Sequence, residues 1–107
     1  MSKLRRIHKQ AATAAALAWT FYEADDFDVD RITLKFASAP TLAENITVTL
    51  DSAQGATYDT VVLSVDPRGS TSIDIEGING FLAGDKVLVS FANTSTISIT
   101  GTATVAV

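Results

Sequence analysis

The chain has 107 residues and a mass of 11.3 kDa; 47% of its residues are hydrophobic, 19% are charged, and its formal net charge is −4. A chain of this length is sufficient for one domain, which excludes an enzyme with separate cofactor and substrate domains. The chain has no cysteine, which excludes disulfide staples, thiolate zinc sites and cysteine nucleophiles. No stretch approaches the roughly 20 apolar residues of a membrane-spanning helix, so we expect no membrane partner.

Charge is distributed unevenly along the chain. The first ten residues hold four basic side chains, those of Lys3, Arg5, Arg6 and Lys9. The rest of the chain has a net charge of −8. Residues 10–18 are rich in alanine, but no cap or polar face frames a helix there. We therefore expect an extended, basic, Ala-rich arm over residues 1–18, ordered by a neighbouring subunit, ahead of a domain over residues 19–107.

The same start also has features of a secretory signal peptide. A basic beginning and an Ala-rich middle precede Ala16-Leu17-Ala18, which fits a small-residue cleavage site. The apolar middle is weak, because alanine and threonine contribute little transfer free energy. A secreted or periplasmic binding domain cleaved near Ala18 stays open as an alternative.

After the arm, apolar and polar residues alternate, which is the period of a β-strand with one buried face. The clearest strand is predicted over residues 45–51, where Ile46, Val48 and Leu50 alternate with threonines. Further strands are predicted over residues 19–23, 31–37, 58–65, 71–76 and 86–92, and two over residues 96–107 with a bend at Gly101. Seven to eight short strands predict a single antiparallel β-sandwich, either jelly-roll or immunoglobulin-like.

Two turns are predicted from their residue types. Asp66-Pro67-Arg68-Gly69 fits a type I turn, which predicts a tight hairpin between the strands on either side. Gly77-Ile78-Asn79-Gly80 contains residues that tolerate positive φ, and we expect it to end the strand before it.

Acidic residues cluster where the sandwich begins, at Glu23, Asp25, Asp26, Asp28 and Asp30. Alternating carboxylates could bind Ca²⁺ or Mg²⁺, but an EF-hand loop needs glycine and glutamate where this chain has Arg31 and Ala37. We therefore expect no resident metal, while cation binding by this cluster stays an open alternative. The preferred interpretation is that the acidic cluster receives the basic arm of a neighbouring copy.

No catalytic or cofactor motif is found in the sequence. The one histidine, His8, lies in the basic arm, and there is no nucleophile elbow, P-loop or zinc-protease motif. We expect neither enzymatic activity nor a cofactor. Nucleic-acid binding would involve the arm alone and is opposed by the acidic body, so we expect none. Trp19 and Tyr22 are predicted to contact a partner.

Several segments resemble the small β-sandwich virion proteins of tailed bacteriophages. They include Ile32-Thr33-Leu34-Lys35-Phe36, Ser38-Ala39-Pro40, Glu44-Asn45-Ile46-Thr47-Val48-Thr49-Leu50-Asp51-Ser52 and Gly84-Asp85-Lys86, within residues 31–95. The resemblance implies a structural protein of the head, as decoration, cement or spike, or of the neck and tail. It implies no catalytic residues.

The combined prediction is a head decoration or cement protein of a phage virion. It would form a homo-oligomer and bridge subunits of the major capsid protein, or other virion proteins, through its arm. The residues predicted to bind partners are Lys3, Arg5, Arg6, Lys9, Trp19, Tyr22, Asp25, Asp26 and Asp28. The alternatives are a neck, tail or spike component, or a receptor- or glycan-binding module that uses its loops.

Overall fold

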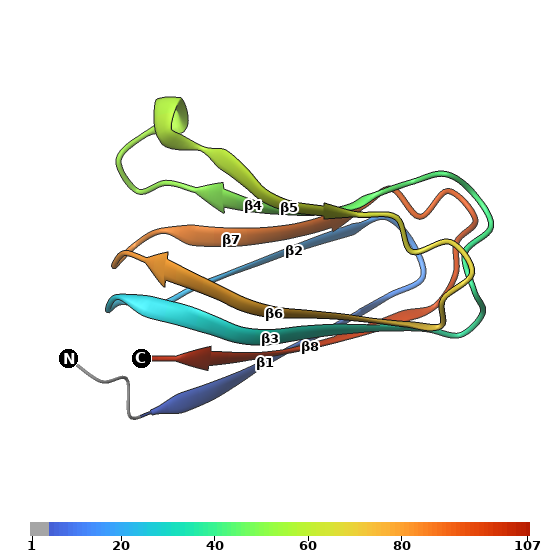
Figure 1. The fold of residues 1–107 in the computed structure, drawn as a ribbon, viewed down its shortest axis with the longest axis horizontal. Coiled ribbons are helices and arrows are strands. Elements are labelled where there is room, and N and C mark those ends of the chain that lie inside the picture. Colours follow the sequence, from blue (N-terminus) through green and yellow to red (C-terminus); the bar gives the residue numbers. More distant parts are fainter. Residues whose placement is uncertain (1–4) are drawn as a thin grey trace.

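The computed structural model describes residues 5–107, which form two antiparallel four-stranded sheets packed face to face (Figure 1). Sheet A contains, in spatial order, β1 (Arg6–Thr13), β8 (Ile99–Ala106), β3 (Phe27–Phe36) and β6 (Ser72–Phe81). Sheet B contains β2 (Leu17–Tyr22), β7 (Lys86–Phe91), β4 (Ile46–Asp51) and β5 (Thr60–Val65). A short 3-10 turn, η1 (Ala56–Tyr58), precedes β5. Within the described part of the chain, no helix is long and apolar enough to cross a membrane.

The strand orders 1-8-3-6 and 2-7-4-5 are those of a jelly roll. The predicted β-sandwich is therefore confirmed, in its jelly-roll form. The hairpin expected at Asp66–Gly69 is wrong, because β5 and β6 lie in different sheets. The turn residues still act locally: the Asp66 carboxylate accepts a hydrogen bond from the Arg68 backbone N–H, and the Gly69 N–H donates to the Pro40 carbonyl. A local turn signal does not determine which strand the chain pairs with next.

The arm predicted over residues 1–18 is not an arm in its described part. Residues 6–13 are strand β1, paired antiparallel with β8 from Arg6 opposite Ala106 to Thr13 opposite Ile99. Strand β2 begins at Leu17, so the predicted boundary between residues 18 and 19 falls inside a strand. The segment is ordered by backbone hydrogen bonds to β8 and not by a neighbouring subunit. An edge strand held by such bonds needs little apolar surface. Lys3 lies outside the described residues.

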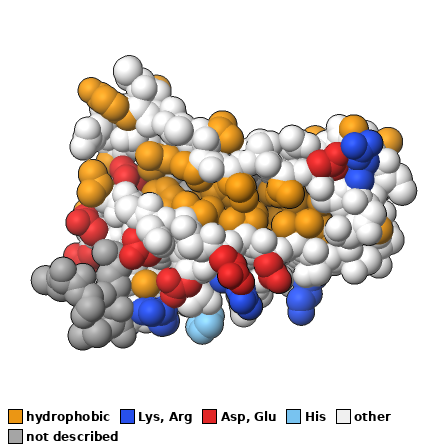
Figure 2. Space-filling model, in the orientation of Figure 1, with side chains coloured by type: hydrophobic (Ala, Val, Ile, Leu, Met, Phe, Trp, Pro, Cys, Tyr) orange, Lys and Arg blue, Asp and Glu red, His pale blue; other side chains and the backbone are white. Residues whose placement is uncertain are grey.

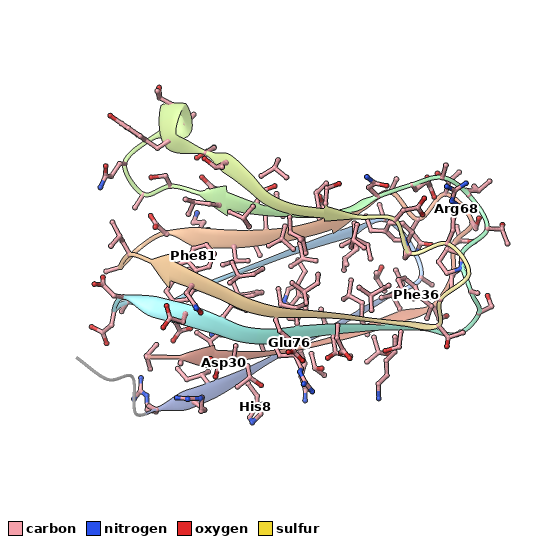
Figure 3. All side chains as sticks on the ribbon, in the orientation of Figure 1. His8, Asp30, Phe36, Arg68, Glu76 and Phe81 are labelled. Atoms are coloured by element: carbon pink, nitrogen blue, oxygen red, sulfur yellow. The ribbon has the colours of Figure 1, made fainter. Side chains whose placement is uncertain are left out.

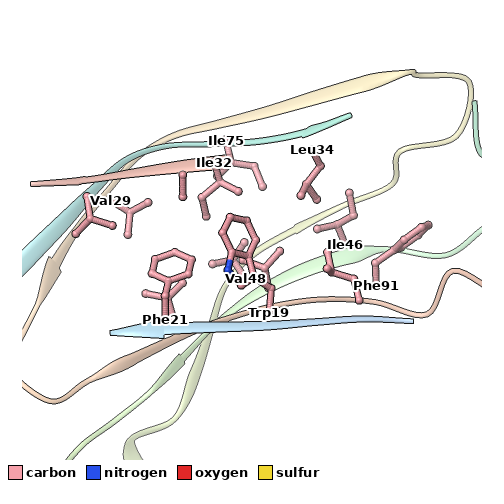
Figure 4. Close-up of a cluster of buried hydrophobic side chains, with 14 of the residues drawn as sticks. Trp19, Phe21, Val29, Ile32, Leu34, Ile46, Val48, Ile75 and Phe91 are labelled. Carbon is pink, nitrogen blue, oxygen red and sulfur yellow. The ribbon is translucent and has the colours of Figure 1, made fainter. Parts of the chain in front are cut away.

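The core lies between the sheets and consists of the inward-facing residues of alternating strands (Figure 4). Trp19 of β2 is 8% exposed and packs over Gly101 in the middle of β8. A Cβ atom at Gly101 would lie 2.9 Å from Cζ3 of Trp19 and 3.1 Å from Cδ2 of Leu34. The predicted bend at Gly101 is therefore wrong: β8 is continuous, and the glycine makes room for the indole.

Strand β6 is longer than predicted because it continues through the glycines expected to end it. Gly77 and Gly80 have φ values of 70° and 92°, and the register with β3 shifts between Phe27 and Val29. A shift of this kind is a β-bulge, which accommodates an unpaired residue without ending the strand.

Candidate interaction surfaces

The basic and acidic segments that the sequence analysis assigned to different copies meet within one chain. Strands β1 and β3 flank β8 in sheet A, so the start of β1 lies across from the start of β3. Nε of Arg6 lies 2.7 Å from Oδ2 of Asp30, and Nζ of Lys9 lies 2.6 Å from Oε2 of Glu23. These charges are therefore paired within the chain, whereas the sequence analysis expected the acidic cluster to receive the basic arm of a neighbouring copy.

The predicted acidic partner residues also make contacts inside the chain. Asp26 Oδ1 accepts a hydrogen bond from the Ala83 N–H at 2.9 Å, and Asp28 Oδ1 accepts one from the Gly80 N–H at 2.8 Å. Both carboxylates thereby anchor the end of β6 and the loop that follows it. Asp25 is exposed. No group of three or more histidine, aspartate or glutamate residues in positions 5–107 could hold a metal ion.

The remaining predicted residues divide between backbone pairing, core and surface. Arg5 exchanges two backbone hydrogen bonds with Val107, of 3.1 and 2.9 Å. Trp19 belongs to the core and is 8% exposed, so its side chain packs within the chain and not on the outer face of the sheet. Because side chains alternate along β2, Tyr22 points away from the core, and its side chain is 59% exposed.

The outer face of sheet A, defined by the outward residues of β1, β8, β3 and β6, has charges of both signs, several of which are paired with one another. Arg31 Nη2 lies 2.6 Å from Glu76 Oε1, and Thr33 donates a hydrogen bond of 2.6 Å to Asp74. Figure 3 labels His8, Asp30 and Glu76 along this side of the molecule, and Figure 2 shows acidic and basic side chains gathered there. This surface resembles an ordinary solvated protein face.

The outer face of sheet B is different in composition. Its outward positions, which alternate with the core residues, are Ala18, Thr20, Tyr22, Leu88, Ser90, Thr47, Thr49, Val61 and Ser64, with charges only at one end, on Asp51 and Lys86. Thr47 and Ser90 share a hydrogen bond of 2.6 Å between their hydroxyls, and Val61 is 58% exposed. The sequence analysis missed this face, because the small outward residues of separate strands form a surface only once β4 and β7 are paired.

An open groove runs along the side where β1 and β2 form the edges of the two sheets. One part of it, of about 580 Å³, is lined by His8, Lys9, Gln10 and residues 19–22. A second part, of about 480 Å³, is lined by Ala11, Ala12, Thr13 and residues 16–20. Consecutive residues of β2 line both parts, so the groove follows the edge of that strand.

The opposite side of the sandwich, between β5 and β6, is also open. Figure 2 shows a band of hydrophobic side chains there. Leu63 and Val65 of β5 and Ile73 and Ile78 of β6 are only partly buried against the core. Val62, the extra residue at a register shift in β5, is 40% exposed.

Two buried polar residues that the sequence analysis did not assign to sites hold loops in place. The Asp85 carboxylate accepts hydrogen bonds from the Ala53 and Leu82 N–H groups, both of 2.9 Å. The Asn93 amide donates to the Ala15 and Ile97 carbonyls at 2.8 and 2.9 Å. Their pairing within the chain identifies them as structural residues.

No protein-family model and no curated protein matches this sequence. Solved structures similar to this chain are found at low sequence identity. It is similar to the crystal structure of PirA, with a TM-score of 0.53, 8% identity and coverage of 90% of this chain and 91% of that one. The Drosophila NLP core has a TM-score of 0.48 at 11% identity and coverages of 94% and 95%. A chain of the Helicobacter pylori bacteriophage KHP30 capsid has a TM-score of 0.47 at 11% identity and coverages of 96% and 92%. At 8% identity the likeness to PirA describes the fold alone.

Proposed function

We propose that the protein is a non-enzymatic structural component of a bacteriophage virion, a head decoration or cement protein that bridges neighbouring capsid subunits. The resemblance of residues 31–95 to small virion proteins favours this role, and the jelly-roll fold is compatible with it. The main structural support is the outer face of sheet B, which is almost free of charge, whereas the outer face of sheet A has charges of both signs, several of them paired within the chain.

An uncharged face of threonine, serine, alanine and exposed apolar residues suits contact with a protein. The centres of protein interfaces are depleted of charged residues, because each buried charge loses its hydration. Hydroxyl groups such as those of Thr49 and Thr20 can hydrogen-bond to a partner or to bridging water. Laid across the joint between two capsid subunits, this face would add buried area to both.

The bridging element in this proposal is the face of sheet B, not a basic arm. Arg6 and Lys9 are already paired with Asp30 and Glu23, and their strand belongs to sheet A. Contact through them would require these intramolecular pairs to break. Contact through sheet B requires no such rearrangement.

The test is binding to shells assembled from the major capsid protein of the same genome. The purified chain is expected to sediment with the shells up to a fixed stoichiometry and to raise the temperature at which they dissociate. Absence of binding at micromolar concentrations contradicts the proposal. Binding on a glycan array without binding to shells would favour the receptor-binding alternative instead.

A further inference from the structure

The sandwich has four edge strands, and three of them have features that discourage pairing with another strand. Edge strands expose unpaired backbone groups, which proteins protect with charged side chains, bulges and irregular backbone. Strand β1 includes Arg6 and Lys9. Strand β5 is shifted in register beside Val61, and β6 contains the positive-φ glycines Gly77 and Gly80.

Strand β2 has none of these features. Its six residues, Leu17–Tyr22, include no charged residue, proline or glycine. Its register with β7 is uninterrupted from Leu17 opposite Phe91 to Tyr22 opposite Lys86, and among the described residues β7 is its sole strand partner. The groove of about 580 Å³ beside it leaves this edge accessible. A regular, uncharged and open edge is a template for another strand.

We propose that the edge of β2 pairs antiparallel with β2 of a second copy of this chain, about a two-fold axis. The two B sheets would then form one continuous eight-stranded sheet. In the register that sets Thr20 opposite Thr20, Tyr22 lies opposite Ala18, so that a large outward side chain meets a small one. On the inner side, Trp19 lies opposite Phe21, an aromatic cross-strand pair of a favourable kind.

The charges near this edge are compatible with a second copy. The Lys9–Glu23 pair lies at the Tyr22 end of β2. Antiparallel pairing brings to that end the Leu17 end of the partner strand, which follows Ala14-Ala15-Ala16. No like charges of the two copies are therefore forced together. Because a two-fold axis makes one surface serve both subunits, a single self-complementary strand is sufficient.

This inference deepens the proposed function, because it names the contact through which copies of an assembly protein would meet. It rests on the proposed function only in that respect. Pairing through β2 would place the outer faces of two B sheets side by side. The result would be a docking face twice as wide, without any change to either sandwich.

The first experiment is sedimentation analysis of the full-length chain across micromolar to millimolar concentrations. We expect a concentration-dependent dimer. The double variant Ala18→Lys, Thr20→Lys places cations at exposed positions of the edge and is expected to weaken the dimer at least tenfold. The matched control is Thr102→Lys, at an exposed position on the outer face of sheet A outside this groove, and it is expected to leave the dimer unchanged.

A second experiment tests the register without relying on the lysine variants. Because the chain has no cysteine, Thr20→Cys introduces a single thiol. Directly opposed residues of antiparallel strands have Cβ atoms about 4.5–5.5 Å apart, close enough for a disulfide after a small adjustment. Mild oxidation is expected to give a covalent dimer with Thr20→Cys and none with Thr102→Cys, whose thiol would lie on the outer face of sheet A.

A chain that stays monomeric throughout this range, or a dimer that survives the lysine variant and does not cross-link at position 20, would overturn the inference. The result is separable from the virion role. If the chain is a monomer that binds shells, only the proposed β2 contact is overturned. If it is a dimer linked through β2 that does not bind shells, only the proposed function is overturned.

Discussion

The outer faces of the two sheets differ although their inner faces are alike. Both sheets contribute regularly alternating apolar residues to one core. On sheet A several outward charges are paired with neighbours, as in the pairs Arg31–Glu76 and Arg6–Asp30. On sheet B the outward positions are small, hydroxylated or apolar, and Tyr22 and Val61 are more than half exposed. The core residues therefore do not distinguish the two faces, whereas the outward residues do. Our proposal places contact with a partner on sheet B for this reason.

The largest expected effect concerns Trp19 of sheet B, which packs over Gly101 of sheet A. Trp19→Ala removes a buried indole from the core and is expected to lower the free energy of unfolding by about 3–5 kcal/mol. Tyr22→Ala, three residues away on the exposed side, is expected to change it by less than about 0.5 kcal/mol. Denaturant unfolding of both variants measures the difference. Equal effects would mean that the sides of β2 are wrongly assigned.

A second variant tests the same contact from sheet A. Gly101→Ala adds a Cβ atom against Trp19 and Leu34, and such overpacking is expected to cost about 1–3 kcal/mol. The matched control is Thr102→Ala, whose side chain is exposed on the outer face. If Gly101→Ala is as stable as the wild type in thermal unfolding, the indole does not need the room that this glycine provides.

The smallest effects are expected among the ion pairs of sheet A. Lys9→Met leaves the Glu23 carboxylate, whose side chain is 11% exposed, without its cation and is expected to cost about 1 kcal/mol. Arg31→Met breaks a pair whose side chains are both 58% exposed, and the expected cost is below about 0.5 kcal/mol. Unfolding in low and high salt checks both values, and a larger cost for Arg31→Met would reverse this ranking.

The sequence predicts the strands better than their partners. Strands such as 46–51 and 86–91 are predicted to within about one residue, because alternation of apolar residues is a local signal. The jelly-roll order is not predictable in the same way, since the pairing of β1 with β8 joins the two ends of the chain. For the same reason the basic start is mistaken for an arm: its charges have partners only after β8 lies between β1 and β3.

The candidate surface is harder to predict than the fold. Charged residues attract attention in a sequence, yet Arg6, Lys9 and Asp28 make contacts within the chain. The face of sheet B consists of residues that are individually unremarkable in composition, such as Thr49 and Leu88, which become neighbours only through the register of β4 and β7. Gly101 is similar, because its role depends on a tryptophan in the other sheet.

The most direct test of the account compares shell binding by two variants with matched changes on opposite faces. Leu88→Glu with Thr49→Glu places two carboxylates at neighbouring positions of the outer face of sheet B. Thr102→Glu with Gln10→Glu does the same on sheet A. With both variants folded by circular dichroism, we predict that the sheet B variant binds capsid shells at least tenfold more weakly than the wild type, while the sheet A variant binds normally. Loss of binding in the sheet A variant alone would contradict the assignment of the docking face to sheet B.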